Sequence, residues 1–232
     1  MHSDDDLTST DIDDAPPAAA GVTRGRPGRP KRGEETGPSR RRRIREAAVT
    51  VFANKGYHEA RVSDIAAEAG VAHGLVYHYF NGKEQLLNDV FRRTWLNIEQ
   101  GLRSIETGGA TPEGQIRDVV RLLLGSYRMS PDLVRVVVLE VTRSGHLRAQ
   151  VDEITESFAI IERIIAQGQQ SGTLRADVPA KLVSYVFWGA VDEILTAWVF
   201  GTMPAEDDDV ASAEHALVEL LLGGMRGSGT GA

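Results

Sequence analysis

The residues of this sequence that are best suited to binding chemistry are basic, and they gather in one short segment. Residues 24–45 contain ten Lys or Arg and two Glu, whereas the full chain of 232 residues has a net charge of −7. An acidic chain with one concentrated basic segment indicates a local contact with a polyanion such as nucleic acid. The distribution of charge, rather than its total, therefore predicts a nucleic-acid binder.

The start of this segment is suited to the minor groove of A·T-rich DNA. A narrow minor groove attracts Arg, Gly allows close approach, and Pro holds the chain extended. Residues 24–32 resemble an AT-hook in this respect. The candidate minor-groove contacts are Arg24, Gly25, Arg26 and Pro27. A generic basic tail has the same composition and is the alternative interpretation.

A second candidate DNA contact lies at residues 62–80, where two short helical patterns flank a turn at Gly70. This layout predicts a helix-turn-helix, whose second helix enters the major groove with its N-terminal residues at the base edges. We expect the start of that helix to contact bases and its aromatic residues to reach phosphates. The candidate DNA-binding residues are Arg40, Arg42, Ser63, Ala72, His73, Gly74, Leu75, Tyr77, Tyr79 and Lys83.

Each of these assignments has a simpler alternative. The aromatic residues of 77–80 are also suited to a core, and Phe80 is expected there. The Arg40–Arg43 run is also typical of a solvated helix start. His73 and His78 are five residues apart, which does not place them on one face of a helix, so no metal site is predicted.

The elements that must position these residues are all predicted to be helices. Apolar residues recur with helical spacing from about Arg40 onward, and we expect helices ending near Gly56, at 62–69, 73–80 and from Asn81 with Glu84 at the capping-box position. Further helices are expected at 113–129, 132–144, 146–171, 179–200 and 206–222. The fold class is all-α: a three-helix DNA-binding domain followed by a larger helical bundle. The expected divisions are a disordered arm at 1–38, domains at 39–95 and 96–225, and a tail at 226–232.

The region 40–95 resembles the DNA-binding domain of the TetR family of repressors. The matching residues are Ile44-Arg45-Glu46-Ala47-Ala48, 51–57, Ile65-Ala66, Ala69-Gly70-Val71, Gly74, 76–80, Lys83-Glu84 and Leu86-Leu87. The resemblance implies a homodimeric repressor that reads a palindromic double-stranded operator. The chain departs from the family's usual residues at Arg61, where Ser or Thr caps the second helix, and at Ala72 and Leu75. We expect Ser63 or water to replace the missing cap at Arg61.

The helix expected at 179–200 is apolar nearly all round, which predicts that it is buried on several sides. With the helix at 206–222 it is expected to form a symmetric four-helix interface. The candidate interface residues are Val186, Gly189, Ala190, Leu217, Leu220 and Leu221. Asp192 and Glu193 interrupt this helix. They indicate either a structural ion pair, with Arg143, Arg148 or Arg163, or a polar anchor beside a ligand cavity.

The region 135–200 resembles the FadR-type repressors of fatty-acid degradation, on Val138-Leu139-Glu140-Val141, Ser144, Leu147-Arg148 and 188–193. That resemblance implies a long-chain acyl-CoA effector in a slot between helices, with phosphates held by Arg at its mouth. The candidate ligand residues are Trp95, Ile98, Leu123, Leu139, Arg143, Phe158, Ile161 and Phe187. Ordinary core packing is the alternative role for each apolar member. A drug or other hydrophobic molecule is the alternative effector, with efflux genes as its target.

Several function classes are disfavoured. The chain has no Cys, and it shows no nucleophile–base pattern, glycine-rich phosphate loop or HExxH helix, so we predict neither an enzyme nor a cofactor. The longest apolar stretch, at 182–201, contains Asp192 and Glu193 and is not predicted to span a membrane. A cytoplasmic protein associated with the nucleoid is expected.

Overall fold

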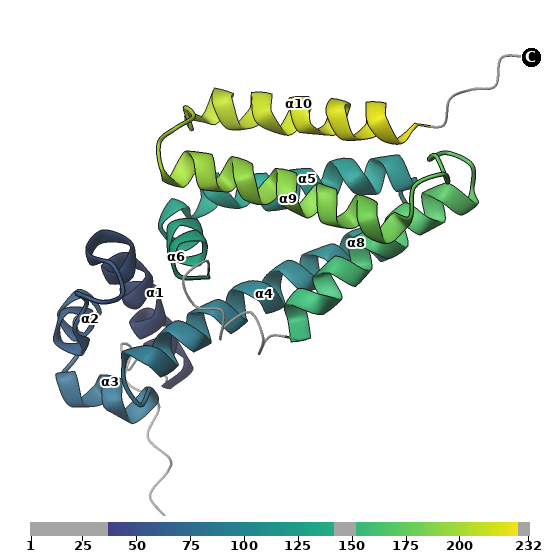
Figure 1. Cartoon of the computed structure of the whole chain (residues 1–232). Coiled ribbons are helices and arrows are strands. Elements are labelled where there is room, and N and C mark those ends of the chain that lie inside the picture. The colour runs from purple at the N-terminus through teal and green to yellow at the C-terminus, as the bar shows by residue number, and fades with distance from the viewer. Residues whose placement is uncertain (1–36, 142–151, 227–232) are drawn as a thin grey trace, which may run out of the picture. The chain divides into compact units, whose positions relative to one another are not determined.

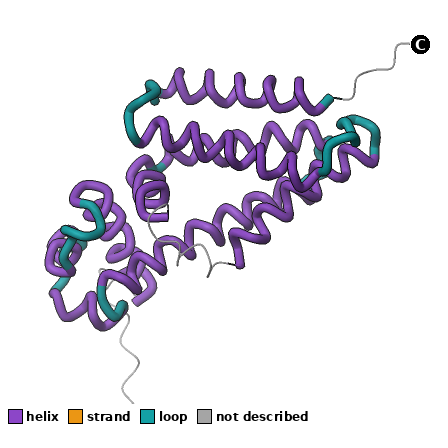
Figure 2. Tube along the Cα trace, in the orientation of Figure 1, coloured by secondary structure: helices purple, strands orange, loops and turns teal. Residues whose placement is uncertain are grey.

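The computed structural model describes residues 37–141 and 152–226, and these residues form helices joined by turns (Figures 1 and 2). Within those two ranges no strand occurs, and one isolated antiparallel bridge joins Leu174 to Arg226. The predicted all-α fold is confirmed. The four candidate residues of the minor-groove arm, Arg24 to Pro27, lie outside the described residues.

The helices agree with those expected from the sequence, apart from their ends. Their bounds are α1 Gly37–Lys55, α2 Val62–Glu68, α3 His73–Tyr79, α4 Lys83–Thr107, α5 Pro112–Met129, α6 Pro131–Val141, α8 Asp152–Gln170, α9 Ala180–Val199 and α10 Asp207–Met225. Helix α1 begins at Gly37, inside the segment predicted to be disordered. Of the helix expected at 146–171, the described part begins at Asp152.

The first hydrophobic cluster joins α1, α2, α3 and the first half of α4. Its members include Ile44, Phe52, Ile65, Val76, Phe80, Leu86 and Phe91, all buried. Val136 of α6 also belongs to this cluster, and α6 packs against α1. The predicted core position of Phe80 is confirmed. The core beneath the helix-turn-helix therefore includes a residue far along the chain.

Two helix starts differ from those expected. At α2, the backbone N–H of Arg61, the residue before the helix, donates to Asp64 Oδ2 at 3.0 Å. The side chain that bonds at this helix start is therefore Asp64 rather than Ser63. At α4, the helix begins at Lys83 after Gly82, whose φ of 99° suits glycine. The N–H of Asn81 donates to Gln85 Oε1, so the partner is Gln85 rather than Glu84.

The second and larger cluster fills the space between α4, α5, α8, α9 and α10. Its most deeply buried members are Leu102, Ile116, Val119, Val120, Leu124, Ile160, Ile161, Ile164, Ile165, Phe187, Val191, Val210 and Leu222. Helices α4 and α8 lie side by side along much of their length (Figure 1).

An ion-pair network supports this contact between α4 and α8. Arg163 Nε lies 2.7 Å from Glu106 Oε1, and Arg163 Nη2 lies 3.0 Å from Glu156 Oε1, which Arg103 Nη2 also contacts at 3.1 Å. The hydrogen bonds that Arg163 donates to Glu106, with a smaller contribution from the one to Glu156, raise the pKa of the Arg163 guanidinium. Exposed ion pairs stabilise a fold little one by one, so the network mainly fixes how the two helices align.

Helix α9 is not buried all round, which corrects the sequence-based expectation. Ser184, Phe187, Trp188 and Val191 face inward, whereas Leu182, Tyr185 and Val186 are exposed. Asp192 and Glu193 are exposed as well, so neither needs the buried ion pair that was one of two interpretations. Arg163, one proposed partner, pairs with α4 and α8 instead. By length and composition alone α9 is long and apolar enough to cross a membrane, but it packs against α5, α6 and α8.

The candidate interface residues divide into two groups. Val186 is 59 % exposed and Leu220 is 75 % exposed, and a Cβ at Gly189 would have no atom within 4 Å apart from its chain neighbours and the backbone of its own helix. Ala190 and Leu221 are half-buried against the larger cluster. Leu217 is only 5 % exposed because it points into that cluster, so it is a core residue of its own protomer and not a surface contact.

Candidate functional site

The helix-turn-helix presents the start of α3 to solvent. Gly70 adopts a φ of 61°, and the N–H of Val71 donates to the carbonyl of Ala66 at 2.9 Å, which closes the turn between α2 and α3. Ala72 precedes α3 and offers no side-chain cap. Ser63, Ala72, His73 and Gly74 are exposed, Leu75 is half-buried, and Tyr77 is 51 % exposed. The ring of Tyr77 contacts that of His73, with centroids 5.2 Å apart.

Lys83 has a different environment from the one expected. Its Nζ donates to the carbonyl oxygens of Tyr57, His58 and Ala60 at 2.8, 2.9 and 3.1 Å, and lies 4.7 Å from the centroid of the Tyr57 ring. An ammonium group has three protons, and here each has an acceptor within the protein. The predicted phosphate contact of Lys83 is therefore replaced by a structural role, in which its side chain secures the loop between α1 and α2.

The basic residues of α1 also differ in their availability. Arg41 Nη2 and Arg45 Nε contact Asp89 of α4 at 2.8 and 2.5 Å, and Arg41 also lies over the ring of Phe80. Arg42 makes one exposed contact of 3.6 Å with Glu46, an arrangement that stabilises little. Arg40 has no ion pair among the described residues. Arg40 and Arg42, the two arginines predicted to contact phosphate, are thus not engaged by Asp89, in contrast to Arg41 and Arg45.

Tyr79 is half-buried rather than freely exposed. It packs against the first hydrophobic cluster and makes an edge contact with the ring of His78. Its hydroxyl lies near the start of α1, 3.5 Å from where a Cβ on Gly37 would be. Tyr79 therefore packs against the core with its ring, and its hydroxyl lies next to the basic start of α1.

We expect the replacement of Asp64 with Asn to destabilise the protein in a pH-dependent manner. Asp64 Oδ1 lies 3.0 Å from Lys55 Nζ, and this contact, followed by the Arg61 N–H, lowers the pKa of Asp64 from its ordinary value of 3.8. A lowered pKa gives a contribution that is complete above the ordinary value and is lost as the pH falls through the lowered one. Melting temperatures of D64N and the natural protein should therefore differ at neutral pH and converge in acid. The exposed carboxylate of Glu68 on the same helix supplies the control, E68Q, and an equal effect of both would contradict the prediction.

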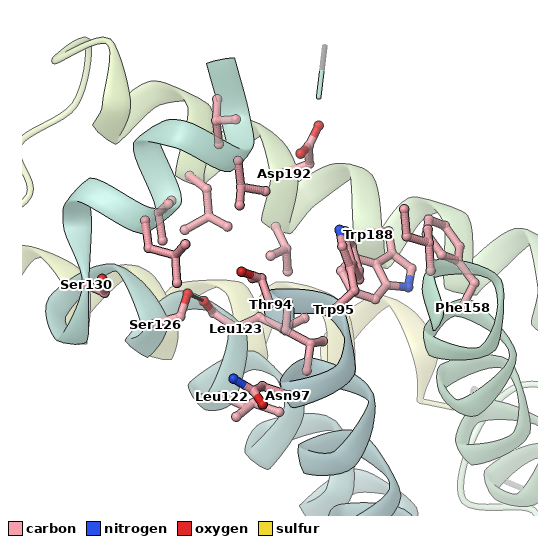
Figure 3. A pocket seen from close by; sticks show the side chains of 18 of the residues that line it. Thr94, Trp95, Asn97, Leu122, Leu123, Ser126, Ser130, Phe158, Trp188 and Asp192 are labelled. Carbon is pink, nitrogen blue, oxygen red and sulfur yellow. Dashed lines mark hydrogen bonds between the residues drawn. The ribbon is translucent and has the colours of Figure 1, made fainter. Parts of the chain in front are cut away.

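A cavity of about 770 Å³ lies between α4, α5, α6, α8 and α9 (Figure 3). Its wall is mostly apolar, with polar side chains at a few positions. The lining residues are Thr94, Trp95, Asn97, Ile98, Leu122, Leu123, Ser126, Met129, Ser130, Leu133, Val134, Val137, Val138, Ile154, Phe158, Tyr185, Trp188, Gly189, Val191, Asp192 and Leu195. This volume and this mixture of groups are typical of a site for a hydrophobic small molecule.

The predicted ligand residues are only partly brought together here. Trp95, Ile98, Leu123 and Phe158 line the cavity. Ile161 and Phe187 do not, because their side chains are buried in the larger cluster, and Leu139 packs against a separate cluster around Val134 and Val199. Arg143 lies outside the described residues, so its phosphate contact stays a prediction.

Several lining residues were not anticipated from the sequence. Trp188 is the most prominent: it stacks on Phe158 with centroids 4.8 Å apart and lies 5.8 Å from the ring of Trp95. Asp192 lines the cavity too, as one of the two interpretations of that residue allowed. Among the described lining residues it is the one with a charged side chain. Its spacing of four residues from Trp188 places both on one face of α9, a relationship that the sequence contains.

Two helices connect this cavity to the helix-turn-helix. On α4, Trp95 lines the cavity and contacts Phe91, which is buried in the first hydrophobic cluster, with centroids 6.2 Å apart. On α6, Val137 lines the cavity while the adjacent Val136 is buried against α1. Both helices therefore extend from the wall of the cavity to the core beneath α3.

Comparisons with known proteins agree with this arrangement. The family described as bacterial regulatory proteins, tetR family, matches residues 44–90, and the YsiA-like protein C-terminal region matches residues 97–224. The fatty acid metabolism regulator protein of Bacillus subtilis is 30% identical over 184 residues, which cover 78% of this chain and 93% of that protein.

Two solved structures are also similar. The fatty acid degradation regulator FadR from Bacillus halodurans is 28% identical with a TM-score of 0.74, covering 82% of this chain and 98% of that one. FadR from Bacillus subtilis, in complex with stearoyl-CoA, is 30% identical with a TM-score of 0.67, covering 79% and 98% of the two chains.

Proposed function

This chain belongs to the TetR family of DNA-binding transcriptional repressors, and from that premise we propose that it is a homodimer released from operator DNA by a long-chain fatty acyl-CoA. The observation that carries the effector assignment is the aromatic and aliphatic cavity between α4 and α9, in a chain 30% identical to a regulator whose structure holds stearoyl-CoA. An acyl chain gains most of its binding energy from removal of its apolar surface from water.

Two copies of α3 provide the DNA-reading surface in this proposal. In a symmetric dimer they must lie about 34–36 Å apart to reach successive turns of the major groove. The exposed residues at the start of α3 then meet base edges, and Tyr77, Arg40 and Arg42 meet the phosphate backbone. The exposed apolar side chains of α9 and α10, together with a groove of about 270 Å³ between them, support the second copy as their partner.

The effector acts on the spacing of the two α3 helices. An acyl chain in the cavity contacts Trp95 of α4 and Val137 of α6, and both helices continue into the core beneath the helix-turn-helix. The effector need only bind more tightly to the state in which the spacing is wrong for DNA. A coupling free energy of about 1–3 kcal/mol then weakens operator binding by about 5–150-fold.

The test is a gel-shift titration of the operator complex with palmitoyl-CoA, with free CoA as the control ligand. We expect palmitoyl-CoA to dissociate the complex and free CoA to leave it intact, since CoA alone does not fill the apolar cavity. In S126W an indole fills part of the cavity, so this variant should bind operator and ignore the acyl-CoA. The matched variant S104W places the same side chain on the exposed face of α4 and should respond normally. A complex that palmitoyl-CoA does not dissociate would contradict the effector assignment.

A second candidate effector is a hydrophobic cation, and one observation favours it. Asp192 is the charged group among the described lining residues, and the aromatic rings of Trp95, Trp188 and Phe158 line the same cavity. Rings and a carboxylate together attract organic cations. Tetraphenylphosphonium separates the two candidates: if a cation is the effector, D192N should lose that response, whereas an acyl-CoA response should survive the substitution.

The DNA-binding face has its own prediction, for the replacement of Tyr77 with Ala. We expect operator affinity to fall about 10-fold, which corresponds to roughly 1.4 kcal/mol, through loss of a contact with the DNA backbone. Because Tyr77 is half exposed, the melting temperature should be unchanged. Fluorescence anisotropy with labelled operator measures the affinity. In Y77F the ring remains without its hydroxyl, so a loss equal to that of Y77A identifies the hydroxyl as the contact. Unchanged affinity and sequence preference in Y77A would overturn the assignment.

A further inference from the structure

Two indole N–H groups in the wall of the cavity have no acceptor among the residues that the structure describes. Trp95 on α4 and Trp188 on α9 both line the cavity, and Nε1 of each is buried with no hydrogen-bond partner in the described part of the chain. The Trp188 side chain is more than nine-tenths buried, since only 8 % of the residue is exposed. Buried N–H donors in folded proteins nearly always have an acceptor, because their removal from water is otherwise uncompensated.

The described residues of the surrounding wall do not supply that acceptor. The ring contacts of the two indoles are with each other, of Trp95 with Phe91, and of Trp188 with Phe158, which lies beside it in Figure 3. The Thr94 hydroxyl on the same turn of α4 donates to the carbonyl of Val90 at 2.9 Å, and neither its oxygen nor any other acceptor among the described residues is bonded to the two indole N–H groups. Among the described residues no acceptor serves these donors, so a molecule inside the cavity is the candidate acceptor.

We propose that Trp95 and Trp188 are specificity-determining residues that select a ligand with a carbonyl oxygen in its buried part. This inference rests on the proposed acyl-CoA function and adds a polar requirement to it. Indole Nε1 is a donor only, and a carbonyl oxygen has two lone pairs, so one such oxygen satisfies either indole or both. A purely hydrocarbon occupant leaves both donors unpaired. The carbonyl is either the thioester of the acyl-CoA or a keto group on the chain.

A third tryptophan provides an internal control. Trp198 Nε1 is also buried without a partner among the described residues, but Trp198 packs against Tyr127 and does not line the cavity. The chain has three Trp, so a two-dimensional spectrum of isotope-labelled protein gives three indole N–H resonances. The variants W95F, W188F and W198F assign them. On addition of palmitoyl-CoA, we expect the proton resonance of Trp95, Trp188 or both to move to the position of a hydrogen-bonded N–H, and that of Trp198 to stay.

The matched ligand is the thioether analogue of palmitoyl-CoA, in which a methylene replaces the thioester carbonyl. If the thioester is the acceptor, the natural protein should bind the analogue about 10-fold more weakly than palmitoyl-CoA by calorimetry, and W95F or W188F should bind the two ligands nearly equally. W198F should discriminate as the natural protein does. If the acceptor is instead a keto group on the chain, the two ligands bind alike, and a long-chain methyl ketone or a keto-acyl-CoA produces the indole shift.

The outcomes separate this inference from the proposed function. A methyl ketone that shifts an indole resonance in a protein that ignores every acyl-CoA supports the carbonyl requirement and overturns the acyl-CoA effector. The protein could instead bind acyl-CoA while no carbonyl ligand shifts an indole resonance and all three Trp variants discriminate equally between palmitoyl-CoA and its thioether analogue. That outcome overturns the role of the two indoles and leaves the effector assignment in place. Binding of neither acyl-CoA nor ketone overturns both.

Discussion

Replacement of Val186 with Glu is expected to convert the protein to a monomer and to abolish tight operator binding. Val186 is 59 % exposed on α9, beside exposed Leu182 and near Leu220 of α10, where a second copy is proposed to pack. A carboxylate at that position has to be desolvated without a partner when two such faces meet. A monomer reads one half-site, and loss of the linked second site weakens binding by about 10²–10⁴-fold.

Light scattering and a gel shift measure the two parts of this prediction. The natural protein should have twice the chain mass of 25.2 kDa, and V186E should have the mass of one chain with an unchanged circular dichroism spectrum. Leu96 on α4 is also an exposed apolar residue, and L96E controls for the introduced charge. A V186E protein that remains dimeric and binds the palindromic operator as tightly as L96E would contradict the proposed interface.

Replacement of Lys83 with Met is expected to lower the free energy of unfolding by about 2–3 kcal/mol, because hydrogen bonds to a charged donor are strong and their loss leaves acceptors unpaired. The substitution removes the donor for three carbonyl oxygens in the loop between α1 and α2, and the contact with the Tyr57 ring. Urea unfolding measures the change. K181M is the control, since Lys181 is exposed at the start of α9 and should have little effect.

The salt dependence of operator binding distinguishes this structural role from a phosphate contact. Loss of one phosphate contact reduces the slope of log affinity against log salt concentration by about 1. We expect K83M to keep the slope of the natural protein under conditions in which both are folded. A stable K83M protein whose slope falls by that amount would show instead that Lys83 binds DNA.

The contrast between α3 and Lys83 shows which parts of the DNA-binding region the sequence can predict. The helix-turn-helix depends on local patterns, namely helical spacing of apolar residues on either side of Gly70, and both helices lie where they were expected. The partners of Lys83 lie 23 to 26 residues away along the chain. No local pattern reports a contact of that kind, so a basic residue after the recognition helix was assigned to phosphate.

The cavity was predicted less completely, for a related reason. Trp95 and Ile98 occur in an amphipathic helix, in which the contrast with the polar face identifies the apolar face as the one that other helices cover. Helix α9 has no such polar stripe, so its periodicity does not show which apolar residues face the cavity and which fill the core. Phe187 was chosen and the adjacent Trp188 lines the cavity. The same ambiguity placed Leu217 of α10 at the interface rather than in the core.

The position of Val136 has a consequence for the use of this DNA-binding region in engineered proteins. Val136 belongs to α6 but is buried in the cluster formed by α1 to α4, and Val137 and Ile154 pack against the same cluster. A graft of residues 37–95 onto a foreign sensor would leave that apolar surface uncovered. A working chimaera therefore needs α6 or another apolar segment that covers this surface. The first four helices alone are not expected to be transferable to another protein.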